Sequence, residues 1–395
     1  MPVLKLGIIC FLWLLGVALI WPILPFQALD LGATPLVVTL LFATDTAVAM
    51  LASPLLGRLS DRLGRRPTMI AGLLVGAAGY LLLAFAGSLE ALFFSRVLGG
   101  LSLAAIPALQ AALADCTSKE RRIHGFSSFN GAYAAAFVVG PLTTWQALEL
   151  FGVSPMAIAL LAGAVTLAAI LLLAPAARPG ELAGEEEESD ADEQQGGWRS
   201  FLVPAFVIPV TAVTLLGIAH SGWDAILAVW SEQKLAWSEG DVAIAYAVAG
   251  SCAAFSQFFL LPRIAAWRGE GSIATLAAIS FAGALVVLAA SQGGPATFLA
   301  LGLFGAAIAT ANSCLFTWLT QVTDDEHQGA ALGLADGLLS MAWLLGPLAA
   351  GLAFSERWAG LPFLLGAAFA LLASGLLLAR PQDSTARATT ALQER

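Results

Sequence analysis

Apolar segments about twenty residues long recur along almost the whole chain, and they constrain its fold more than any other feature. A helix needs about 20 apolar residues to cross the hydrocarbon core of a bilayer. Because each run is continuously apolar rather than alternating, helices are favoured over the strands of a membrane β-barrel. The sequence therefore predicts an all-α membrane protein with twelve transmembrane helices, near residues 5–27, 36–56, 67–87, 91–114, 126–149, 155–174, 202–230, 241–261, 272–291, 296–320, 330–353 and 362–379.

The composition excludes several classes of protein. Of the 395 residues, 59% are hydrophobic and 11% are charged, whereas soluble domains contain about 25% charged residues. A soluble enzyme, a nucleic-acid-binding protein and a secreted disulfide-rich protein are therefore excluded. No glycine-rich phosphate loop and no paired nucleophile and base are found, so neither an enzyme nor ATP-driven transport is indicated. Four widely spaced cysteines, Cys10, Cys116, Cys252 and Cys314, indicate no metal site, and no cofactor is expected.

The negative charge of the chain is concentrated in one segment. Of the formal net charge of −9, residues 175–200 carry −6. Acidic, glycine-flanked runs of this kind are typical of solvated linkers. We therefore predict an N-terminal six-helix bundle over 1–174, an acidic cytoplasmic linker over 175–200, a C-terminal six-helix bundle over 201–380 and a cytoplasmic tail over 381–395.

Lysine and arginine residues predict the orientation of the chain. If the amino terminus is cytoplasmic, 15 of the 18 basic residues fall on the cytoplasmic side. Only Lys234 and Arg357 fall outside, and Arg96 lies within a span. This bias follows the positive-inside rule, and it predicts a multi-pass protein of the inner (plasma) membrane with both termini cytoplasmic.

An internal repeat relates the two halves of the chain. A shift of 206 residues aligns Gly140-Pro141 with Gly346-Pro347, Asn130 with Asp336, and Gly99 with Gly305. Parallel repeats of this kind build transporters whose substrate site lies near the membrane midplane between the repeats. The repeat therefore predicts two pseudo-symmetric six-helix bundles.

A basic loop between the second and third predicted spans carries the most specific motif. The string GRLSDRLGRRP begins at Gly57 and contains four arginines, which cannot enter lipid. The loop is therefore expected at the cytoplasmic rim, where Gly57 and Gly64 would allow close backbone packing. This string closely resembles the loop 2–3 signature of the major facilitator superfamily.

The resemblance extends over nearly the whole chain to the twelve-helix drug:proton antiporters, especially the tetracycline-efflux-like branch. It is carried by WPILPFQALDL (21–31), SRVLGG (95–100), ALADCTSKERRIHG (112–125), VVGPL (138–142) and SEQKLAWSEGDV (231–242). The resemblance implies a secondary transporter of the multidrug-resistance type that exports small compounds by alternating access. It also implies a gating motif (Gly57, Asp61, Arg62, Gly64, Arg65, Arg66 and Asp115), a proton-coupling arginine (Arg96), and helix bends at Gly140-Pro141 and Gly346-Pro347.

The chain departs from the tetracycline-efflux branch at its coupling groups. The acids of helices 1 and 3 align with Trp13 and Gly79, and the histidine of helix 8 aligns with Ala253. The glycine pair after Gly140-Pro141 is replaced by Thr143-Thr144. Tetracycline itself is therefore not the favoured substrate.

Polar residues at membrane depth are the remaining candidates, because burying a charge there costs at least about 2.5–3.5 kcal/mol. Asp45 lies twelve residues before Gly57, about 18 Å along a helix and thus near the midplane. For proton coupling and the substrate cavity we select Asp45, Arg96, Asp336, His220, Asp224, Asn130, Asn312 and Trp318. Other readings stay open: a capped or Arg96-neutralised Asp45, a structural ion pair at Arg96, a helix-packing hydrogen bond at Asp336 and a solvated, interfacial Asp224.

The leading hypothesis is proton-coupled efflux of a small apolar or amphipathic compound, with protons as the coupling ion. The expected partners are a small-molecule substrate and the lipid bilayer, without nucleic acid, and the expected state is a monomer. A lipid or glycolipid flippase, or an uncoupled facilitator, is the alternative on the same fold. A receptor or assembly factor that does not transport is a third possibility, against which the intact loop motif argues.

Overall fold

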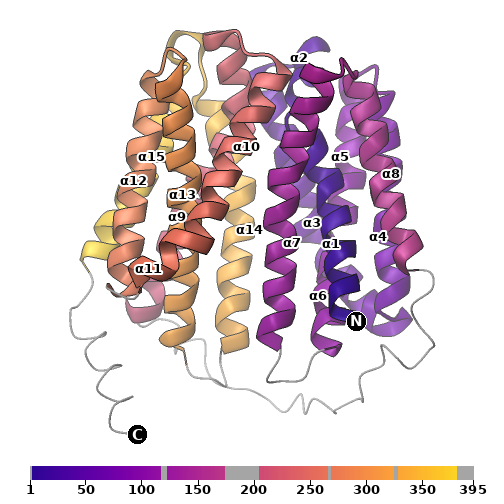
Figure 1. Cartoon of the computed structure of the whole chain (residues 1–395), viewed down its shortest axis with the longest axis horizontal. Coiled ribbons are helices and arrows are strands. Elements are labelled where there is room, and N and C mark those ends of the chain that lie inside the picture. Colours follow the sequence, from indigo (N-terminus) through magenta and orange to yellow (C-terminus); the bar gives the residue numbers. More distant parts are fainter. Residues whose placement is uncertain (1, 117–121, 174–203, 266–267, 324–327, 380–395) are drawn as a thin grey trace, which may run out of the picture. The chain divides into compact units, whose positions relative to one another are not determined.

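The computed structural model describes residues 2–116, 122–173, 204–265, 268–323 and 328–379 (Figure 1). The predicted linker and tail, 175–200 and 381–395, lie outside the described residues. Across the described ranges the regular elements are helices: α1 (Pro2–Ile20), α2 (Leu24–Asp30), α3 (Pro35–Leu63), α4 (Arg65–Ala84), α5 (Leu89–Leu103), α6 (Ile106–Asp115), α7 (Arg122–Trp145), η2 (Gln146–Leu150), α8 (Pro155–Leu173), α9 (Pro204–Leu235), α10 (Glu239–Phe255), η4 (Ser256–Leu260), α11 (Leu261–Ala265), α12 (Glu270–Ala290), α13 (Pro295–Gln321), α14 (Gln328–Ala353), η5 (Glu356–Trp358) and α15 (Leu361–Leu378).

Eleven of these helical segments are long and apolar enough to cross a membrane, judged by length and composition over the described residues. Three of them combine several elements: α1 with α2, α5 with α6, and α10 with η4 and α11. The twelfth predicted span corresponds to α7, a helix of 24 residues. The predicted all-α membrane fold is confirmed. Most predicted span boundaries lie within a few residues of the helix ends, but α3 continues past the predicted end at residue 56 to Leu63. Most of the string GRLSDRLGRRP is therefore helical rather than a loop, and only Gly64 separates α3 from α4.

Local sequence signals set where several helices begin. Thr34 caps α3 by accepting a hydrogen bond from the Val37 N–H, and Pro35 occupies the first turn, where no N–H is needed. Ser88 caps α5 in the same way through the Ala91 N–H. Such caps satisfy N–H groups that the helix itself leaves without partners.

The chain divides into two compact units, and each is described by itself. Unit 1 holds the helices up to α8, together with residues 224–251 of α9 and α10 and residues 347–359. Within unit 1, α1 packs against α7 and α8, α4 against α5 and α8, and α3 against α5. Gly140 permits the close contact of α7 with α1, because a Cβ there would lie 2.5 Å from the Cβ of Ala18.

Unit 2 contains residues 204–223 of α9, residues 252–346, and the chain from residue 360 onward. Its helix α12 packs against both α13 and α15. Helices α9 and α14 approach closely where Gly346 faces the Ile218 carbonyl, and Ser221 Oγ donates a hydrogen bond across them to the Ala342 carbonyl at 3.0 Å. Small residues allow such approaches of backbones in membrane helices, where packing replaces the hydrophobic effect as the driving force.

Candidate functional site

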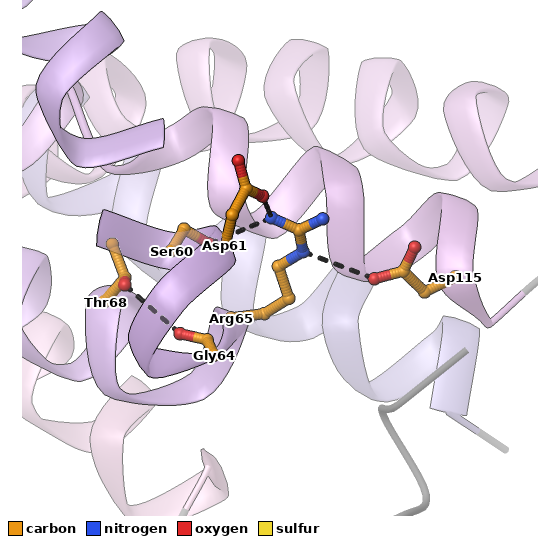
Figure 2. Close-up of polar contacts among 6 residues, drawn as sticks. All are labelled: Ser60, Asp61, Gly64, Arg65, Thr68 and Asp115. Atoms are coloured by element: carbon orange, nitrogen blue, oxygen red, sulfur yellow. Dashed lines mark hydrogen bonds and ion pairs between the residues drawn. The ribbon is translucent and has the colours of Figure 1, made fainter. Parts of the chain in front are cut away.

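A charge cluster lies where α3, α4 and α6 end or begin in unit 1 (Figure 2). The Arg65 guanidinium donates through Nη1 to Asp61 and to Ser60 Oγ, the latter at 3.3 Å. Its Nε donates to Asp115 Oδ2 at 3.3 Å. Asp61 and Asp115 are 54 residues apart in sequence, so one arginine ties the α3–α4 turn to the end of α6. The structure thus brings together three of the seven residues that the family resemblance places in the gating motif: Asp61, Arg65 and Asp115.

Glycine plays a different part in this motif from the one predicted. A Cβ at Gly57 would meet nothing within 4 Å, so the expectation of close backbone packing there is wrong. Gly64 connects α3 to α4 with a φ of 94°, a conformation that favours glycine because side chains clash there. Its carbonyl accepts a hydrogen bond from Thr68 Oγ1 at 3.2 Å. Gly64 therefore sets the turn that positions Arg65.

Replacing Arg65 by lysine is expected to slow transport roughly tenfold, because a lysine ammonium cannot bridge two carboxylates as a planar guanidinium does. The free energy of unfolding should change by less than about 1 kcal/mol, since both ion pairs are partly exposed. Substrate flux in proteoliposomes and thermal unfolding measure the two effects. Arg58→Lys, at an exposed position of α3, is the matched control. Wild-type flux in Arg65→Lys would contradict a gating role.

A second site is a buried ion pair between α3 and α5 in unit 1. Arg96 Nη1 lies 3.4 Å from Asp45 Oδ2, and the two residues are only 3% and 6% exposed. The other carboxylate oxygen, Asp45 Oδ1, and Arg96 Nη2 are buried without a hydrogen-bond partner. The pair is therefore buried, and its hydrogen-bonding groups are only partly satisfied, which is costly in a membrane interior.

Close contact of α3 and α5 creates this pair. A Cβ at Gly100 would lie 2.5 Å from the Asp45 carbonyl oxygen, and one at Gly99 would lie 2.9 Å from Asp45 Oδ1. Arg96 Nε is held by Ser95 Oγ at 3.3 Å. The SRVLGG string thus supplies the guanidinium that pairs with Asp45. It also supplies the two glycines, whose lack of a side chain leaves room for Asp45. Of the readings left open for Asp45, the structure supports pairing with Arg96.

Positions where the tetracycline-efflux branch carries acids serve packing in this chain. Trp13 is 1% exposed and donates from Nε1 to Ser102 Oγ at 3.0 Å. Gly79 lets α4 approach α5, because a Cβ there would lie 3.1 Å from the Ser95 carbonyl. At these two positions the side chains therefore serve helix packing, and Asp45 is a buried acid nearby in α3.

His220 belongs to an aromatic cluster in unit 2. Its ring centroid lies 5.4 Å from that of Trp343 and 5.5 Å from that of Phe304, and Trp223 packs on Phe304 at 4.0 Å. Asp224, on the next turn of α9 but assigned to unit 1, is 7% exposed, so its reading as a solvated acid is wrong. The roles predicted for His220 and Asp224 in proton coupling or the substrate cavity stay predictions.

The other predicted cavity residues differ in burial. Asp336 is exposed at the surface of unit 2, and its carbonyl accepts from Ser340 Oγ. Trp318 is 5% exposed within α13. Asn312 is half-buried, and its Oδ1 is buried without a hydrogen-bond partner. The Asn130 side chain lies outside the described residues.

The two prolines predicted to bend helices, Pro141 and Pro347, lie inside α7 and α14. The bends themselves stay predictions.

Sequence reasoning missed a contact at the end of unit 1 opposite the charge cluster. Helix α7 runs between these two ends and continues into η2 (Figure 1). In η2, the Glu149 carboxylate accepts from Ser238 Oγ at 3.4 Å, and a Cβ at Gly240 would lie 2.7 Å from Glu149 Cγ. Ser238 and Asp241 cap the start of α10 reciprocally. A carboxylate at a helix amino terminus is favoured by the helix dipole.

Helices of membrane-spanning length, a basic helix–helix junction with a bridging arginine and a buried acid within a membrane-spanning helix together indicate a membrane carrier rather than an enzyme. The chain belongs to the Major Facilitator Superfamily, whose family model matches residues 6–347.

Several bacterial proteins with sequences similar to this chain are named for drug resistance. The multidrug resistance protein 1 of Bacillus subtilis (strain 168) is 25% identical over 345 residues, covering 87% of each chain. The class B tetracycline resistance protein of Escherichia coli is 26% identical over 372 residues, covering 92% of this chain and 91% of the relative. The quinolone resistance protein NorA of Staphylococcus aureus (strain MSSA476) is 24% identical, covering 87% of each chain.

Solved structures share the fold. The human organic anion transporter MFSD10 (TETRAN) aligns with a TM-score of 0.64 at 23% identity, over 95% of this chain and 98% of that one. The nucleoside transporter NupG aligns with a TM-score of 0.75 at 13% identity, over 96% and 99% of the two chains. Its membership of the Major Facilitator Superfamily and its membrane-spanning helices make the chain a multi-pass membrane transporter.

Proposed function

We propose that this protein exports a small apolar or amphipathic compound across the plasma membrane in exchange for protons, and that Asp45 is the proton site. The observation that carries the proposal is the Asp45–Arg96 ion pair, which is buried between α3 and α5 within predicted membrane spans. Relatives named for resistance to several drugs, to tetracycline and to quinolones support efflux as the direction. Both termini lie in the cytoplasm in this proposal, and the protein works as a monomer.

Protonation of Asp45 would raise the free energy of the conformation in which the Asp45–Arg96 pair is buried. While Asp45 is ionised, its charge compensates that of Arg96. A proton on Asp45 removes this compensation and leaves the guanidinium, which cannot release its own proton, as an unpaired buried charge. Breaking a buried pair in this way costs about 3–5 kcal/mol. The chain then favours a conformation in which Arg96 reaches water or another partner, and proton binding is thereby linked to the change of access.

Alternating access requires contacts at either end of the transporter to form and break in turn. At one end, Arg65 with Asp61 and Asp115 forms the cytoplasmic gate. At the other end, Glu149 of the first six spans rests on the start of α10, which belongs to the last six. We assign this second contact to the outer gate, which holds while the transporter is open to the cytoplasm.

Everted membrane vesicles with an imposed pH gradient, acidic inside, test this function. A fluorescent amphipathic amine dye should accumulate in vesicles that contain the protein and should leave when a protonophore collapses the gradient. Vesicles from cells without the protein correct for passive partition of the dye. Transport that persists unchanged after the gradient has collapsed would replace this proposal by the uncoupled facilitator or flippase.

A further inference from the structure

A seam of neutral polar side chains joins two helical segments inside unit 2. Ser256 Oγ and Thr310 Oγ1 form a hydrogen bond of 2.6 Å, and Ser313 Oγ donates to Gln257 Oε1 at 3.0 Å. Ser256 and Gln257 begin η4, a π-helical turn between α10 and α11. Such turns are rare and occur frequently at functional sites, because the extra residue per turn redirects side chains.

The accessible side of α13 beside this seam does not have the composition of a lipid-facing surface. Near the start of the helix, Leu299 and Leu303 are exposed, as expected toward lipid. Farther along, the accessible positions carry mostly small or polar side chains: Ala306, Ala309, Asn312, Ser313, Phe316, Thr317, Thr320 and Gln321. Two of these hydroxyls donate within the protein, Ser313 to Gln257 Oε1 and Thr320 to the Thr317 carbonyl. This stretch of α13 is therefore more polar on its accessible side than the start of the helix.

The seam carries hydrogen-bonding groups but no charge. Helix α13 contains no charged residue, and the charged residues of α10 and α11 (Glu239, Asp241 and Arg263) stand near the ends of that span. Asn312 Oδ1, an acceptor, is buried without a hydrogen-bond partner. Gln257 uses its carbonyl oxygen for Ser313 and retains two N–H donors in its amide. The seam thus complements a neutral solute that has both a donor and an acceptor.

We propose that Gln257, Asn312 and Ser313 form a subsite that selects uncharged compounds bearing hydroxyl or amide groups on an apolar body. The inference rests on the proposed export function and names a substrate class for it. A solute hydroxyl or amide N–H would donate to Asn312 Oδ1, and a solute carbonyl would accept from the Gln257 amide. Sites built to hydrogen-bond a substrate group discriminate strongly against analogues without it, because their own polar groups are then left unpaired.

Two radiolabelled probes test the subsite on the full chain in lipid nanodiscs and proteoliposomes. Chloramphenicol is uncharged and carries an amide and two hydroxyls, whereas tetraphenylphosphonium is an apolar cation without hydrogen-bonding groups. Asn312→Leu and Gln257→Met each keep side-chain size while removing the polar groups. We expect the ratio of chloramphenicol to tetraphenylphosphonium affinity to fall roughly tenfold in each variant. Ser313→Ala should lower the ratio less, because the serine only orients Gln257.

Ser280→Ala is the matched control for Ser313→Ala, because Ser280 Oγ bonds only within α12, to the Leu276 carbonyl, and should leave the ratio unchanged. Equal losses of both probes, or no loss, in Asn312→Leu and Gln257→Met would overturn the subsite. Wild-type protein that binds and transports tetraphenylphosphonium but not chloramphenicol would also overturn it and leave the export function standing. Failure to transport either probe along a pH gradient would overturn the export function, and the subsite with it.

Discussion

Asp45→Asn is expected to reduce gradient-driven substrate accumulation in everted vesicles at least tenfold. Asparagine has the shape of aspartic acid but cannot bind and release a proton. The pH gradient can therefore no longer drive transport through this residue. Exchange of labelled for unlabelled substrate without a gradient should continue, because substrate binding does not need the carboxylate. Asp30→Asn, at an exposed acid, is the control and should behave as wild type.

The same substitution should also destabilise the protein, because it leaves the Arg96 guanidinium buried without a counter-charge. The expected loss is about 3–5 kcal/mol of unfolding free energy, measurable as a lower Tm in detergent. Adding Arg96→Met to Asp45→Asn removes both charges and should restore most of the stability without restoring coupling. If the double variant recovers coupled transport as well, the pair is purely structural and the proposed proton site is wrong.

Cross-linking η2 to α10 is expected to abolish at least nine-tenths of transport. A Cβ at Gly240 would lie 2.7 Å from Glu149 Cγ, which is one bond from Glu149 Cβ. The two Cβ atoms of Glu149→Cys and Gly240→Cys therefore come within disulfide range, about 3.5–4.5 Å. The bond would hold the outer gate shut and prevent alternating access. Transport should return on reduction with dithiothreitol.

The native cysteines and a second pair provide the controls for this experiment. Cys116 and Cys252 are partly accessible and are replaced by serine beforehand. Gly360→Cys with Ala289→Cys joins α12 to α15 within unit 2, where a Cβ on Gly360 would lie 3.2 Å from the Ala289 Cβ. These helices belong to the same half of the chain, so their cross-link should leave transport active. Full transport by the oxidised η2–α10 pair would contradict the gate.

Functional residues were predictable from the sequence only where they belong to a local motif or are an unusual residue type for their position. Asp45 and Arg96 stood out because charges are rare at membrane depth. The charge cluster followed from a loop signature and from the turn after the fourth span. Glu149, Ser238 and Gly240 carried no such mark, since an acid and small residues near helix ends are ordinary. Gln257 and Ser313 were equally inconspicuous, because polar side chains often join membrane helices.

Hydropathy and charge along the chain determined the helical membrane fold and most of its span boundaries, because the bilayer acts on each segment separately through its length and polarity. Tertiary structure alone decided which polar groups meet. Asp45 and Arg96 are 51 residues apart, and Gln257 and Ser313 are 56 apart. Their pairing depends on how each helix is rotated about its axis and on where glycines and π-helical turns shift the contact. Those are properties of packed helices together, which no single segment encodes.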